Sequence, residues 1–170
     1  MKVRNCSVVV LFILILSSFV CADTSMESFT SSAGGFSISM PGTPKESVQY
    51  VDSAAGKLEL HQFTVEDGNI AYIVMYNDYP RTPESQETFF NNVRDGGANA
   101  VKGKVTKEKI ISRQGYPGRA FDIQTTDTLL LQDVYLVGKR LYQIILGVPK
   151  ADKMPSQSNQ FFSSFKLTQP

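Results

Sequence analysis

The chain has few of the residue types on which catalytic and metal-binding sites most often depend. Its 170 residues include one histidine, two cysteines and no tryptophan. With the single imidazole of His61, one chain cannot form a multi-histidine metal site. Both cysteines, Cys6 and Cys21, lie within the first 22 residues. If cleavage removes that segment, the mature chain has no disulfide, no reactive thiol and no cysteine metal site.

The chain also lacks an excess of charge of either sign, with 17 basic and 16 acidic side chains. Because such a balanced chain has no strong electrostatic field, its composition disfavours nucleic-acid binding. One local band of cations consists of Lys102, Lys104, Lys107, Lys109 and Arg113. Lysines on an edge strand commonly prevent association between sheets, and we prefer this interpretation to an acidic partner.

The N-terminus has the pattern of a secretory signal peptide. Lys2 and Arg4 precede an apolar run over 8–20, and small residues allow cleavage between Ala22 and Asp23. The run is shorter than the roughly 20 residues of a membrane-spanning helix. We therefore expect a signal peptide over 1–22, a mature chain without a transmembrane segment, and a periplasmic or secreted protein, located in the thylakoid lumen if the source is photosynthetic.

An alternative for the same segment is a lipoprotein acylated at Cys21. A lipoprotein peptidase requires a small residue before the cysteine, whereas Phe19 and Val20 are bulky. The sequence therefore favours a cleaved signal over a lipid anchor.

The rest of the chain predicts one folded domain. Residues 23–34 are rich in Ser, Thr and Gly, which predicts a flexible leader, and a single α+β domain is expected over 35–170. Phe36, Ile38 and Met40 alternate with serines and predict a strand that ends at a Pro-Gly turn. Further strands are expected over 58–65, 70–76, 104–114, 119–125 and 129–148, the last folded back at 138–139, with a Gly-Tyr-Pro-Gly turn over 115–118.

Two helices are predicted among these strands. A capping hydroxyl, a proline and a carboxylate at Thr82-Pro83-Glu84 indicate a helix start, and the helix is expected to run to Asp95 and end at a Gly-Gly pair. A second helical segment opens at Pro155. This order predicts a mostly antiparallel β-sheet flanked by helices, in the α+β class.

No catalytic or cofactor motif is present. The sequence has no Gly-x-Ser-x-Gly elbow and no spaced aspartate loop for calcium, and we expect no catalytic residue, metal or cofactor. Two alternatives remain open. One is an extracytoplasmic hydrolase that uses paired carboxylates from among Glu59, Asp122 and Asp133. The other is a small-ligand carrier lined by aromatic residues, namely Tyr72, Tyr76, Phe121, Tyr135 and Tyr142.

Four segments resemble a group of uncharacterised exported bacterial proteins: residues 35–44, 115–119, 140–143 and 161–165. The order of elements over 35–167 is similar to that of the PsbP-like (PsbP/Mog-type) family, an α/β/α sandwich. This resemblance implies a non-catalytic accessory domain that docks on a larger assembly. It implies no functional residue at any position of this chain, since a fold alone does not transfer a site.

The leading hypothesis is therefore an exported binding or accessory domain with a protein partner. The candidate binding residues are Tyr116, Arg119 and Arg140, because a tyrosine in a turn and arginines at strand starts can present aromatic and cationic contacts. The alternative is that the two arginines form surface pairs with Asp122 and Asp133. The sequence leaves the oligomeric state open.

Overall fold

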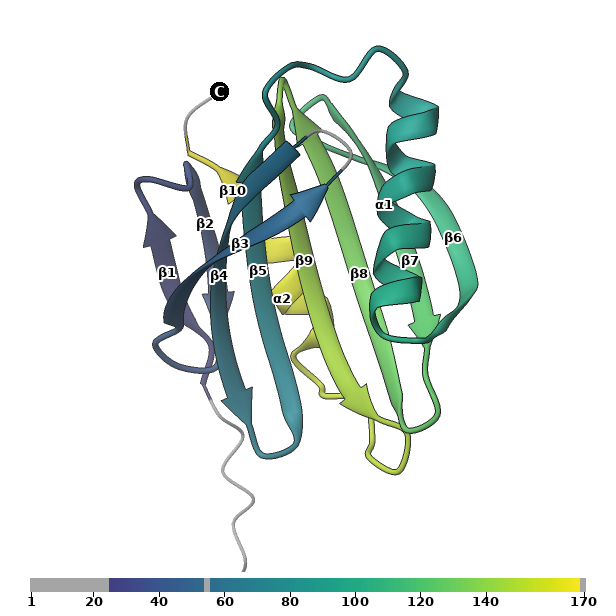
Figure 1. Cartoon of the computed structure of the whole chain (residues 1–170). Coiled ribbons are helices and arrows are strands. Elements are labelled where there is room, and N and C mark those ends of the chain that lie inside the picture. Colours follow the sequence, from purple (N-terminus) through teal and green to yellow (C-terminus); the bar gives the residue numbers. More distant parts are fainter. Residues whose placement is uncertain (1–24, 54–55, 169–170) are drawn as a thin grey trace, which may run out of the picture.

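The structure, a computed structural model, describes residues 25–53 and 56–168 (Figure 1). The predicted signal peptide and its cleavage site lie outside the described residues. Within them the order of elements is β1 (Glu27–Ser31), β2 (Phe36–Met40), β3 (Lys45–Ser53), β4 (Gly56–Asp67), β5 (Ile70–Asp78), α1 (Gln86–Ala100), β6 (Lys104–Arg113), β7 (Tyr116–Gln124), β8 (Thr128–Val137), β9 (Arg140–Pro149), α2 (Ser158–Ser164) and β10 (Lys166–Leu167).

The strands form two antiparallel sheets. The larger sheet has the order β3-β4-β5-β9-β8-β7-β6, and the smaller has the order β1-β2-β10. Strands β5 and β9 join the two halves of the larger sheet, with Val74 opposite Ile144. The prediction of an α+β chain built mostly on antiparallel sheet is confirmed.

Both faces of the larger sheet are covered. Helix α1 packs against β6 and β7 on one face, and α2 packs against β2 of the smaller sheet on the other (Figure 1). Because side chains alternate along a strand, Leu141 of β9 enters the cluster under α1 whereas Tyr142 enters the cluster beneath the smaller sheet. Each fully buried apolar side chain contributes about 1.5–3 kcal/mol, so both clusters stabilise the fold.

Strand β2 supplies the centre of the larger core. Phe36, Ile38 and Met40 are buried as their alternation predicts. The ring of Phe36 lies 5.5 Å from that of Phe63 and 5.8 Å from that of Phe165, measured between centroids. The N-terminal and C-terminal parts of the domain therefore meet at this residue.

The predicted start and end of the first helix are wrong. Residues 82–84 belong to the preceding loop, and the helix begins after Ser85, whose hydroxyl accepts a hydrogen bond from the Thr88 amide at 3.2 Å. The helix also continues through Gly96 and Gly97 to Ala100. Ala98 is buried against the sheet, and this packing offsets the low helix propensity of the glycines.

The prediction of a flexible leader is wrong for its described part, and the sequence predicts neither β3 nor β10. Strand β1 pairs with β2 from Glu27 opposite Met40 to Ser31 opposite Phe36, so the folded part begins before Gly35. Strand β3 was missed because both of its faces are largely exposed, which removes the apolar alternation by which strands are found in sequences.

The turn predicted over 115–118 begins earlier in the chain, and its two central residues are Gln114 and Gly115. Gln114 and Gly115 have φ values of 50° and 84°, as a tight two-residue hairpin turn requires. Tyr116 is therefore a strand residue, opposite Arg113 of β6. The prediction that Tyr116 is displayed on a turn is wrong.

Candidate functional site

Arg140, one of the predicted binding residues, holds the turn between β1 and β2 against the larger sheet. Its Nε and Nη2 atoms donate to the two carboxylate oxygens of Asp78, each at 2.7 Å. Its Nη1 atom donates to the carbonyls of Ala33 at 3.0 Å and Gly34 at 3.1 Å. The guanidinium also lies 4.6 Å from the ring centroid of Tyr76. All three nitrogens are engaged, so Arg140 has a structural role.

Arg119, the second candidate, joins the sheet to α1. Its guanidinium forms an ion pair with Glu108 of β6 and lies 5.9 Å from the ring centroid of Phe90 in the helix. Arg94 of α1 binds the other oxygen of Glu108 at 2.9 Å. Burial raises the pKa of Glu108, but the two guanidiniums outweigh this effect and its pKa is lowered. Arg119 therefore acts as a packing and charge contact.

The structure separates Tyr116 from Arg119. Tyr116 packs against the core beneath the smaller sheet, whereas Arg119, at an odd-numbered position of the same strand, faces α1. The predicted surface pairs are also wrong. Asp122 binds Lys107 Nζ at 3.2 Å, and Asp133 accepts a hydrogen bond from the Tyr135 hydroxyl at 3.1 Å.

The carboxylates of the hydrolase alternative lie away from the pocket beside α1, and the aromatic residues of the carrier alternative are buried. Asp122 and Asp133 occupy diagonal positions on one face of the β7–β8 pair, and Glu59 lies on β4, which β5 and β9 separate from β8. Within residues 25–53 and 56–168 no group of three or more His, Cys, Asp and Glu side chains is placed to hold a metal. The five aromatic residues of the carrier hypothesis are at most 4% exposed and fill the core.

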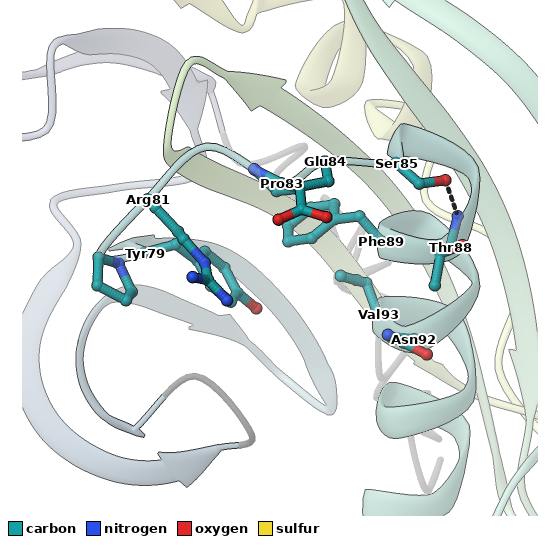
Figure 2. Close-up of a pocket in the computed structure, with 10 residues that line it drawn as sticks. Tyr79, Arg81, Pro83, Glu84, Ser85, Thr88, Phe89, Asn92 and Val93 are labelled. Carbon is teal, nitrogen blue, oxygen red and sulfur yellow. Dashed lines mark hydrogen bonds between the residues drawn. The ribbon is translucent and has the colours of Figure 1, made fainter.

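One pocket of the described residues lies between α1 and the loop that precedes it (Figure 2). It has a volume of about 840 Å³ and is open to solvent. Its lining consists of Tyr79, Pro80, Arg81, Pro83, Glu84, Ser85, Thr88, Phe89, Asn92 and Val93. No sequence motif marks these residues, since their proximity depends on the path of the loop.

The floor of this pocket is aromatic and fixed in position. The rings of Tyr79 and Phe89 meet edge to face, with centroids 5.0 Å apart. The backbone amide of Tyr79 donates to the Lys139 carbonyl at 2.8 Å and anchors the loop to the β8–β9 turn. Burial raises the pKa of Tyr79, so its phenol stays protonated at neutral pH. The floor is therefore neutral and largely apolar.

Two opposite charges stand on the rim. Figure 2 shows the side chains of Arg81 and Glu84 extending from the loop over the pocket. Both residues are exposed, and within the described part of the chain neither takes part in an ion pair. The pocket thus combines an apolar floor with one unneutralised cation and one unneutralised anion.

A second surface of interest is the free edge of β3. This strand pairs with β4 over nine consecutive residues without a register shift, and its other edge is unpaired in the described structure. Val48, Tyr50 and Val51 are 46%, 63% and 37% exposed. We call this strand and its exposed apolar side chains the β3 edge.

Polar side chains of the β3–β4 hairpin surround the lone histidine. His61 Nε2 lies 3.0 Å from Glu59 Oε1, and Nδ1 lies 3.5 Å from Glu46 Oε1. Its ring stacks on Tyr76 with centroids 4.5 Å apart. His61 is thus a partly exposed hydrogen-bonding residue, as its place in a strand predicts.

Comparison with known proteins assigns no function to the pocket or to the β3 edge. The chain matches no protein-family model and no curated protein sequence. Among the described residues, no helix is both long and apolar enough to cross a membrane.

Proposed function

We propose that the chain is an exported, non-catalytic accessory domain that docks on a larger extracytoplasmic or membrane-associated assembly. We further propose that it docks by pairing the β3 edge with an extended segment of a partner protein. The observation that carries this proposal is the contrast between the two edge strands of the larger sheet. Export rests on the signal-like sequence of residues 1–22.

An edge strand presents unpaired amides and carbonyls that can bind another strand, and proteins usually block such edges. Strand β6 is blocked, because it has a register shift between Val105 and Lys107 and carries several lysines. Strand β3 has no such shift, no proline and a single lysine, Lys45. Of the two edges, β3 is therefore the one suited to accept a strand.

The side chains around the β3 edge indicate the chemistry of the partner. Val48 and Tyr50 offer apolar and aromatic contacts to residues on a neighbouring strand, where each favourable pair contributes roughly 0.2–1 kcal/mol. Glu46 and Glu59 flank them, each about half exposed. Since Glu46, Val48 and Tyr50 share one face of β3, we propose a partner segment that carries both its aliphatic and its basic residues at every second position, on that same face.

We propose the PsbP-like α/β/α sandwich as the fold family. The proposal is supported by an antiparallel sheet that has a helix on one face and a helix with a small sheet on the other. An accessory role is what the resemblance implies. The placement of Arg119 and Arg140 in internal contacts moves the proposed docking site away from them.

The proposal is tested by capture with matched edge variants. Tagged wild-type protein, Val48→Lys and Ile110→Lys are purified from the envelope of source cells, and retained proteins are quantified by mass spectrometry. Ile110 is the control because it is 75% exposed on the blocked edge. We expect one stoichiometric partner that Val48→Lys loses at least tenfold and Ile110→Lys retains.

A photo-crosslinking residue in place of Tyr50 then locates the contact. A crosslink to one extended, basic segment of that partner supports the proposal. Crosslinks to a second copy of this chain, equal loss in both variants, or the absence of a stoichiometric partner would overturn it. A mature N-terminus other than Asp23, or a lipid on Cys21, would overturn the cleaved-signal part of the proposal.

A further inference from the structure

The pocket beside α1 has features that the docking proposal does not use. Its volume of about 840 Å³ lies within the range of small-molecule sites, roughly 300–1,000 Å³. It lies at the start of α1, whereas the β3 edge lies on the outermost strand of the larger sheet. A ligand in this pocket would therefore be bound independently of β-strand docking.

The floor favours an apolar or aromatic group. Phe89 is buried and its ring is held edge to face against Tyr79, so both rings are already ordered before a ligand arrives. Val93, one turn further along α1, extends the apolar surface. An ordered floor lowers the entropic cost of binding, because few side chains must be immobilised.

The rim disfavours ligands with a single charge. Arg81 would attract an anion, but Glu84 on the same loop would repel it, and the reverse holds for a cation. A ligand that carries both charges satisfies both side chains. Thr88 and Asn92, which also line the pocket, offer hydrogen bonds to amide groups.

We propose that this pocket binds a zwitterion with an apolar body, that is, an amino acid or short peptide with an aromatic or branched side chain. The carboxylate pairs with Arg81, the ammonium group pairs with Glu84, and the apolar side chain lies on the Tyr79–Phe89 floor. Since exposed ion pairs are weak, each rim charge contributes a factor of about five to affinity. The expected dissociation constants are therefore in the range of ~0.1–10 mM.

The test is a titration of the isotope-labelled exported protein with defined probes, followed by NMR chemical shifts. The probes are phenylalanine and Gly-Phe-Gly, with N-acetylated and C-amidated forms of each, and Gly-Ser-Gly is the control that lacks an apolar side chain. We expect saturable shifts at Tyr79, Thr88 and Phe89, about fivefold weaker binding when either terminus is blocked, and no saturation with Gly-Ser-Gly. Binding of phenylalanine alone indicates a free amino acid as ligand, and stronger binding of Gly-Phe-Gly indicates a peptide.

Charge variants supply a second, independent readout. Arg81→Glu and Glu84→Arg should each weaken binding of the zwitterion by about fivefold or more. The double variant Arg81→Glu/Glu84→Arg should restore it, because the reversed rim accepts a reversed ligand. Lys153→Glu is the control, as Lys153 is an exposed cation outside the pocket.

The proposal is overturned if no probe shifts the pocket residues at 20 mM, a concentration about twice the weakest expected dissociation constant. It is also overturned if blocked and unblocked probes bind equally, or if the double variant remains as weak as Arg81→Glu. The altered side chains are exposed loop residues, and an unchanged thermal midpoint confirms that each variant is folded.

Discussion

Replacing Arg140 with methionine should cost about 3 kcal/mol of unfolding free energy at pH 7. The two-pronged ion pair with Asp78 is partly exposed and contributes about 1 kcal/mol. The bonds from one charged nitrogen to two turn carbonyls contribute about 1.5 kcal/mol together. The cation over the Tyr76 ring adds about 0.5 kcal/mol. Methionine retains the apolar stem, so the substitution removes mainly the polar contacts.

This cost depends on pH with a defined sign. The hydrogen bond from Arg140 lowers the pKa of Asp78 below its ordinary value of 3.8 in the folded state. A carboxylate with a lowered folded pKa contributes its stability above the unfolded pKa and loses it as the pH falls through the folded value. The difference between wild type and Arg140→Met should therefore be constant from pH 5 to 7. Below about pH 4 it should decrease to about 2 kcal/mol, the contribution of the carbonyl and ring contacts.

Urea unfolding measures this difference. Far-ultraviolet circular dichroism and tyrosine fluorescence report the transition, because the chain has seven tyrosines and no tryptophan. Arg81→Met is the matched control and should change stability by less than about 0.5 kcal/mol, because Arg81 is exposed and has no ion pair among the described residues. A cost below about 1 kcal/mol for Arg140→Met, or a difference that does not decrease in acid, would refute the proposal that Arg140 holds the β1–β2 turn against the larger sheet.

Four further substitutions test the packing and the N-terminal cap of α1. Gly118→Ala should lower the free energy of unfolding by about 2 kcal/mol or more, because the added Cβ would lie 2.5 Å from the Val134 carbonyl oxygen. Gly96→Ala should raise it by about 0.5–1 kcal/mol, because the added Cβ meets nothing within 4 Å. Urea unfolding midpoints compare the two variants. Phe161→Ala should cost about 3–5 kcal/mol in the same assay because that ring is fully buried, and a smaller effect would show that the cavity collapses. Ser85→Ala should cost about 1 kcal/mol and reduce amide-exchange protection in the first turn of α1, which an intact first turn in the variant would contradict.

Elements with one clearly buried face could be predicted from the sequence. Strand β2 shows this well, since its alternation of large apolar residues and serines corresponds to its buried and partly exposed faces. Strand β3 could not be predicted, because it pairs only with β4 in the described structure and keeps both faces largely in water. The exposure that makes β3 a candidate docking edge is therefore also the reason why the sequence does not predict this strand.

The site residues were harder to predict than the elements. The sequence predicts Arg140 to be a binding cation on the surface, but its acceptors Asp78 and Ala33 lie 62 and 107 residues away in the sequence. The pocket beside α1 depends on the conformation of the loop before the helix, and no spacing rule encodes that conformation. Sequence patterns report local periodicity, whereas these features depend on long-range contacts.

The order of strands also determines when the chain can fold. Strand β2 is made early, yet its partner β10 is made last, with Phe36 opposite Leu167. Strand β5 likewise waits for β9 to complete the larger sheet. Because synthesis proceeds from the N-terminus, neither sheet can close until almost the whole chain has emerged. If the chain is exported as proposed, neither sheet is complete until late in synthesis, which favours passage through a narrow export channel.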